Sequence, residues 1–170
     1  LLAHGAFVTT VDKTAFDGSL DPVAYERIGQ AHADALARRA HFGHRLVAEA
    51  GLYFSSRTRD WFAREKPAEY FQGFLGAHKA MVYDHVPWAV ILDENATLAT
   101  LRQFPVVILP NAAIVSENEA ELFRRYASEG GQLIVTGLSG CADRWGKLQG
   151  GSSLESLIGA RLVHKLDSLD

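Results

Sequence analysis

Residues 105–137 read PVVILPNAAIVSENEAELFRRYASEGGQLIVTG, and this stretch decides the fold class. It begins and ends with short apolar runs, Pro105–Leu109 and Gln132–Thr136, which have the length and composition of buried strands. Between them, Ser116 and Glu119 have the spacing of a capping box that begins a helix, and a pair of glycines ends it. The stretch therefore predicts a strand, a helix and a second strand parallel to the first.

Two more short apolar runs precede this unit, at Ala50–Ser55 and Trp88–Leu92. None of the four runs alternates between apolar and polar residues, which is typical of strands that are buried on both faces. We therefore expect four central strands. Their alternation with helical segments predicts the α/β class, with a three-layer, doubly wound, mostly parallel sheet of the flavodoxin-like kind.

A long helix is predicted from Pro67 between the first two of these strands. Its apolar side chains recur at helical spacing and define the face that we expect to pack on the sheet. That predicted face comprises Phe71, Phe74, Leu75, His78, Val82 and His85.

The two ends of the chain are less regular. Leu1–Val11 is predicted to be a buried strand, and a helix capped by Asp21 should run from Pro22 to near Gly43. Because this apolar run starts at the first residue, without an initiator methionine, we expect a piece of a longer chain: residues 1–45 belong to a preceding domain, and residues 46–170 form the α/β domain. At the other end, a short helix around residues 154–158 and a last strand around residues 161–164 are expected.

Composition limits the classes of partner. The chain has 170 residues, enough for one full domain with an appendage. Its net charge of −3, without a basic stripe, argues against nucleic acid, and no apolar run approaches the roughly 20 residues of a membrane span. One cysteine excludes an internal disulfide and fits a reducing compartment such as the cytoplasm. The histidines lack metal-binding spacing, so no metal is expected. No G-x-G-x-x-G fingerprint follows any strand, and no cofactor is expected either.

Ligands in open α/β sheets gather at the carboxyl ends of the strands. The first strand leads into a hydroxyl-rich, basic loop with Ser55, Ser56 and Arg57, and Asn111 follows the third strand. These four residues are the candidate ligand-binding residues, as in a flavodoxin-like small-molecule binding module, although a solvated loop or a subunit contact is the simpler expectation. After the second strand, the residues from Asp93 to Asn95 either place two carboxylates near a site or begin the next helix, and the helix start is the favoured expectation.

The fourth strand leads into Gly137-Leu138-Ser139-Gly140-Cys141. A nucleophile elbow, G-x-S-x-G, would require glycine where Cys141 stands, so the hydrolase motif is incomplete. Cys141 could still act as the nucleophile of an amidotransferase-like hydrolase if a histidine lay beside it. No residue of the chain is assigned a catalytic role from its sequence.

The order of segments carries a family resemblance over residues 48–165. The segments GLYFSSRTRDWF, EYFQGFLGAHKAMVYDHVPWAVILDE, FPVVILPNAAIVSENEAELFRRYASEGGQLIVTGLSG and SLESLIGARL resemble the β-galactosidase trimerisation domain of family 42 glycoside hydrolases.

The resemblance implies a fold similar to class I glutamine amidotransferases, a homo-oligomer, and a preceding TIM barrel that acts on a carbohydrate substrate. Residues 1–45 would then be the last βα unit of that barrel, and its unpaired strand should make the chain associate. The amidotransferase cysteine would fall at Leu138 or Ser139 here, so the resemblance implies an accessory domain that is inactive alone, without cofactor.

Overall fold

The computed structural model describes Leu2 and residues 6–163, and it divides the chain into two compact units, residues 1–46 and 47–170. Unit 1 contains helix α1, Pro22–Ala37, followed by a short 3-10 turn at Arg39–His41. The Asp21 carboxylate caps α1 by accepting from the Val23 and Ala24 amides, as predicted. The helix ends at Ala37, however, six residues before the predicted stop at Gly43.

The predicted first strand is wrong over its described part. Residues 6–11 form no strand, and Leu1 and residues 3–5 lie outside the described residues. Apolar, β-branched residues form a strand only when a neighbouring strand accepts their backbone hydrogen bonds. Unit 1 offers no such neighbour among its described residues.

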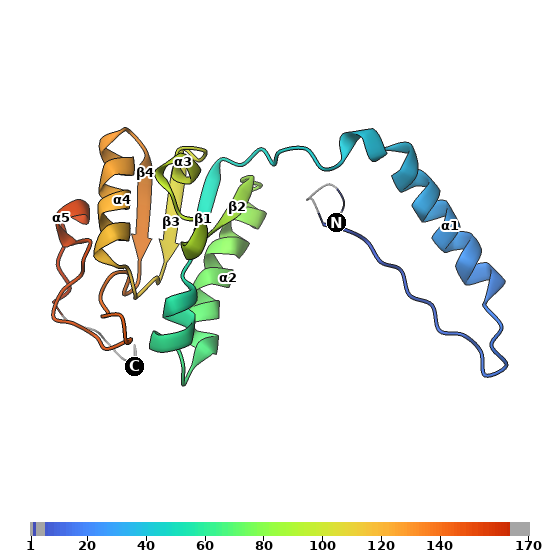
Figure 1. Ribbon diagram of the computed structural model, residues 1–170, viewed down its shortest axis with the longest axis horizontal. Helices are drawn as coiled ribbons and strands as arrows, with labels where there is room; N and C mark the ends of the chain where they lie inside the picture. The colour runs from blue at the N-terminus through green and yellow to red at the C-terminus, as the bar shows by residue number, and fades with distance from the viewer. Residues whose placement is uncertain (1, 3–5, 164–170) are drawn as a thin grey trace. The chain divides into compact units, whose positions relative to one another are not determined.

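The described residues of unit 2 form a four-stranded, all-parallel sheet with the strand order β2-β1-β3-β4 (Figure 1). The strands are β1 (Ala50–Phe54), β2 (Trp88–Leu92), β3 (Val106–Pro110) and β4 (Gln132–Thr136). This order is that of a flavodoxin-like doubly wound sheet and confirms the predicted α/β class. Only β1 and β3 are central. Strands β2 and β4 lie at the edges, which corrects the expectation of four central strands.

Helices cover both faces of the sheet. Helix α2 (Pro67–Tyr83) packs against β1 and β3 on one face, whereas α4 (Glu117–Ser128) lies on the other with the short α3 (Leu98–Leu101), as Figure 1 shows. The predicted capping box is present, because the Ser116 side chain accepts from the Glu119 amide while the Glu119 carboxylate accepts from the Ser116 amide. Helix α5 (Glu155–Ile158) forms as predicted, but residues 161–163 form no strand, and His164 lies outside the described residues.

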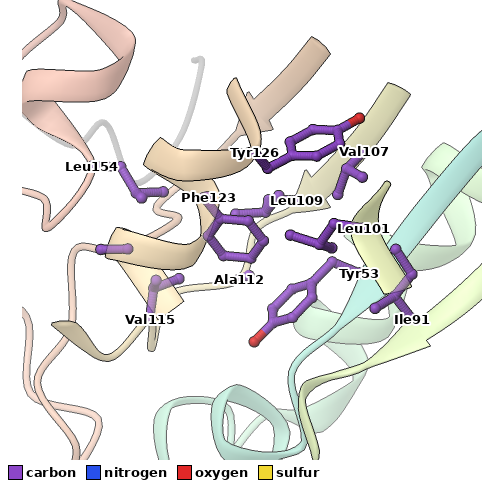
Figure 2. Close-up of a cluster of buried hydrophobic side chains, with 11 residues drawn as sticks. Tyr53, Ile91, Leu101, Val107, Leu109, Ala112, Val115, Phe123, Tyr126 and Leu154 are labelled. Atoms are coloured by element: carbon purple, nitrogen blue, oxygen red, sulfur yellow. The ribbon is translucent and has the colours of Figure 1, made fainter. Parts of the chain in front are cut away.

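The larger core lies between the sheet and the α3–α4 layer. Phe123 is fully buried there, and its ring meets the Tyr53 ring edge-on with 5.3 Å between the ring centroids. Leu109 and Leu154 belong to the same buried cluster (Figure 2). A smaller cluster on the other face joins Leu52 to α2.

The buried face of α2 is rotated from the one predicted. The residues of α2 that pack against the sheet are Tyr70, Phe74, Ala77, His78 and Met81. Of the predicted face, Phe74 and His78 are among them. Phe71, Leu75 and Val82 are exposed, and His85 lies beyond the helix with a positive φ of 55°. Helix α2 has apolar residues on two adjoining sides, and its sequence does not tell which side is buried. Packing against the sheet buries the side that contains Tyr70 and Met81.

Candidate functional site

The carboxyl edge of the sheet brings together a network of polar side chains. Arg57, just after β1, pairs with Glu119 at the start of α4 and lies 3.6 Å from the Asp93 carboxylate after β2. The Tyr53 hydroxyl donates to the same Glu119 carboxylate at 2.5 Å. Glu119 also accepts from the Ser116 hydroxyl and amide. One carboxylate therefore links β1 to the start of α4.

The electrostatics of this network follow from burial. The Asp93 and Glu119 side chains are almost buried, while the Arg57 side chain stays half-buried. Burial raises the pKa of the Tyr53 hydroxyl above its ordinary range, and the adjacent Glu119 carboxylate raises it further. Partial burial lowers the pKa of the Arg57 guanidinium, but the two carboxylates more than reverse this, and the net shift is upward. Tyr53 is thus a neutral donor and Arg57 a fixed cation.

Ser55 belongs to a second, fully buried network. Its amide donates to the Tyr70 hydroxyl at 2.7 Å, and its hydroxyl donates to the Ile114 carbonyl at 3.3 Å. The Thr58 hydroxyl donates to the Ser55 hydroxyl at 2.9 Å and accepts from the Ile114 amide at 3.0 Å. The expectation of a solvated loop is wrong at Ser55 and Thr58, which are buried where the loop folds back into the domain at the start of the turn Thr58–Phe62. A subunit contact by this loop stays a prediction.

The four candidate ligand-binding residues lie at the same edge of the sheet but in different surroundings. Ser55 is buried, Ser56 is half-buried, and Arg57 is held by two carboxylates. Asn111 has a positive φ of 53°, and its side-chain oxygen accepts from the Leu138 amide at 2.9 Å. Three of the four thus have partners within the domain. Ligand binding by Ser55, Ser56, Arg57 and Asn111 stays a prediction.

The sequence did not predict that Asp93 and Glu119 pair with Arg57 or that Tyr53 joins them through Glu119. Asp93 was expected to begin a helix rather than to place a carboxylate near a site, but Thr97 caps α3 instead, because its side chain accepts from the Thr100 amide. Asp93 is free to pair with Arg57 because it lies in a separate turn, Asp93–Asn95. The local sequence contains no signal for a pairing between residues so distant along the chain.

The thiol of Cys141 is placed for packing rather than for nucleophilic attack. It is 3% exposed, and its sulfur contacts the Ser139 carbonyl at 3.7 Å. Burial raises the pKa of Cys141, more than the hydrogen bond with Ser152 lowers it. At neutral pH the protonated thiol therefore predominates, and the protonated form is a poor nucleophile.

We expect Cys141 in the native chain to react with iodoacetamide at pH 7 at least about 100-fold more slowly than in the unfolded chain, because both burial and the raised pKa suppress the exposed thiolate. Labelling rates measured by mass spectrometry, with and without denaturant, check this. Comparable rates in the two states would restore Cys141 as a nucleophile candidate.

The described residues contain no group of three or more His, Cys, Asp or Glu side chains arranged to hold a metal ion. Within the same part of the chain, no helix is both long and apolar enough to cross a membrane. A shallow depression between Arg102, Tyr126 and Gln132 lies at the opposite, amino edge of β3 and β4, away from all four candidate residues.

The fold and the carboxyl edge of the sheet define the class of this protein. It is a doubly wound α/β domain in which most polar residues at the strand ends are held by partners within the domain. The family model described as "Beta-galactosidase trimerisation domain" matches residues 48–170. The chain belongs to the β-galactosidase trimerisation domain family.

Solved structures with this fold include three β-galactosidases. Gan42B, a GH42 β-galactosidase from G. stearothermophilus, is 20% identical with a TM-score of 0.67, and the match covers 84% of this chain and 21% of that one. The β-galactosidase of the psychrophilic Marinomonas ef1 is 18% identical with a TM-score of 0.60, covering 84% and 23%. The β-galactosidase of Bifidobacterium adolescentis is 18% identical with a TM-score of 0.58, covering 67% and 54%.

This chain therefore spans between about a fifth and about half of the length of these enzymes. None of the curated protein sequences compared with the chain matches it. The structural likeness shows the fold, and the family match shows an accessory rather than a catalytic domain.

Proposed function

We propose that this chain is the oligomerising part of a β-galactosidase-like glycoside hydrolase and that it has no turnover by itself. The family match over residues 48–170 is the observation that carries this proposal. The carboxyl edge supports it, because the carboxylates there hold Arg57 and Tyr53 rather than opening toward a substrate. The acid and nucleophile carboxylates of such an enzyme would lie in its catalytic barrel, outside this chain.

We further propose that residues 1–45 are the last βα unit of that barrel. Helix α1 buries none of its residues within the described part of the chain, and Leu36 and Tyr25 on it are exposed. Phe7 and Phe16, before the helix, are also exposed. A unit with so many uncovered apolar side chains lacks a core of its own, so its stability depends on packing against a larger body.

The proposed function also implies the partners, the substrate and the cellular compartment of the protein. The partners are further copies of the chain and the barrel, and the substrate of the whole enzyme is a carbohydrate. The net charge of −3 supports protein rather than nucleic acid as the partner. The lone, buried thiol supports a reducing compartment, the cytoplasm.

Light scattering of the purified chain, run beside a chromogenic β-galactoside assay, tests this function. We expect a mass that is a multiple of 18.6 kDa and no hydrolysis above the buffer blank. A Cys141→Ala variant serves as the control for amidotransferase-like chemistry and should behave as the parent chain does. A monomer at all concentrations, or any turnover by the chain, would contradict the proposal, and turnover that the Cys141→Ala change removes would assign the activity to this thiol.

A further inference from the structure

The outer flank of α2 exposes a row of apolar side chains. Phe71, Leu75 and Val82 are separated by four and seven residues, a spacing that places them on one side of the helix. Their exposed fractions are 38%, 47% and 48%. The sheet-facing side of the same helix buries Tyr70 and Met81. Helix α2 is therefore apolar on two adjoining sides, and the sheet covers only one of them.

The exposed row continues onto strand β2. Parallel register pairs Leu52 with Val90, so both side chains are on the face of the sheet that α2 covers. Leu52 is fully buried beneath α2, whereas Val90 on the edge strand is 45% exposed. The His78 and Trp88 rings meet at 4.8 Å and join the helix to the strand. We call this set the α2–β2 surface: Phe71, Leu75, His78, Val82, Trp88 and Val90.

His78 supplies a second observation at this surface. Its Nδ1 atom is buried and has no hydrogen-bond partner among the described residues. A buried polar atom without a partner is costly, and native proteins pair most such atoms with protein groups or water. The sheet also ends here, because β2 has β1 on one side and no strand on the other within the described sheet. An exposed sheet edge is a site where another chain can add contacts.

We propose that the α2–β2 surface is the face on which a second copy of this chain docks. This inference rests on the proposed oligomerising function and names the surface that performs it. The family of this chain is described as a trimerisation domain, which makes a ring of three copies the expected assembly. Such a ring is built from heterologous contacts, in which one patch of each copy meets a different patch of the next. The surface therefore has to fit another part of the neighbouring copy, not itself. Its apolar centre with aromatic members has the composition of an interface core.

The test replaces Leu75 with glutamate in the full 170-residue chain. Leu75 is exposed, and glutamate is a good helix former, so the fold should be kept and only the docking face should change. We expect the concentration at which the oligomer half-dissociates, measured by sedimentation velocity, to rise at least tenfold. Leu36→Glu on α1 is the matched control, because it places the same charge on an exposed helix position of unit 1.

A second readout uses thiol labelling. In a Leu75→Cys chain, maleimide should label residue 75 more slowly at high than at low protein concentration, while the buried Cys141 stays unlabelled. If the parent chain associates but Leu75→Glu leaves the association unchanged, or Leu36→Glu alone disrupts it, the surface is assigned wrongly and the proposed function stands. If the parent chain is a monomer at every concentration, the proposed function fails, and this inference fails with it.

Discussion

Replacing Glu119 with alanine is expected to lower the free energy of unfolding by about 3–5 kcal/mol, because the change leaves buried polar groups without their partner. The carboxylate accepts from the Tyr53 hydroxyl, pairs with Arg57 and completes the capping box with Ser116. The Tyr53 hydroxyl is buried and would remain an unpaired donor. Loss of the cap alone accounts for about 1 kcal/mol of this effect.

Glu121→Ala is the matched control for this change. Glu121 lies on the same helix, two residues further along, and is exposed with an ion pair to Arg124. An exposed pair of this kind contributes little, so we expect a change within about 0.5 kcal/mol. Urea unfolding followed by circular dichroism measures both variants. Equal midpoints for the two variants would mean that the network at the carboxyl edge does not stabilise the domain.

Phe123→Ala is expected to cost about 3–5 kcal/mol as well, through the loss of buried apolar area and the cavity that remains. The Phe123 ring is fully buried between α4 and the sheet, against Tyr53 and Leu109, as Figure 2 shows. Removing it deletes the ring contact between α4 and Tyr53 of β1. The same urea titration reports the loss as a lower midpoint.

Phe16→Ala is the matched control, because it makes the same substitution at a phenylalanine that is exposed instead of buried. Phe16 is fully exposed in unit 1, so its removal should change the unfolding of unit 2 by less than about 0.5 kcal/mol. A loss below about 1 kcal/mol for Phe123→Ala would show that α4 does not pack on the sheet as described. Neither change touches the α2–β2 surface, so oligomer formation by the folded chain should be unaltered.

The elements of unit 2 could be predicted because their signals are local. The capping box of α4 involves residues three apart, so a helix start of this kind can be predicted from a few neighbouring residues. Strands β2 and β4 were predicted with the bounds they have, and β1 and β3 within one residue, because short apolar runs between turn residues have few other stable arrangements. The family resemblance relied on the order of these same elements.

Two of the errors concern contacts between distant residues. The sequence of α2 contains apolar residues on two adjoining sides, and only packing on β1 and β3 decides that Tyr70 and Met81 are buried while Leu75 is not. The predicted strand in residues 1–11 fails over residues 6–11 for a related reason, since a strand needs a neighbour to complete its hydrogen bonds.

The features of the candidate site likewise separate into those that local sequence predicts and those that depend on tertiary contacts. The sequence by itself determined the α/β class, the caps at the starts of α1 and α4, and which polar residues stand at the ends of strands, because each depends on neighbours along the chain. Only the tertiary structure decided that Arg57 pairs with Asp93 and Glu119, which lie 36 and 62 residues away, and that β2 is an edge strand. Those features depend on strand order, which brings remote segments together and which no local pattern encodes.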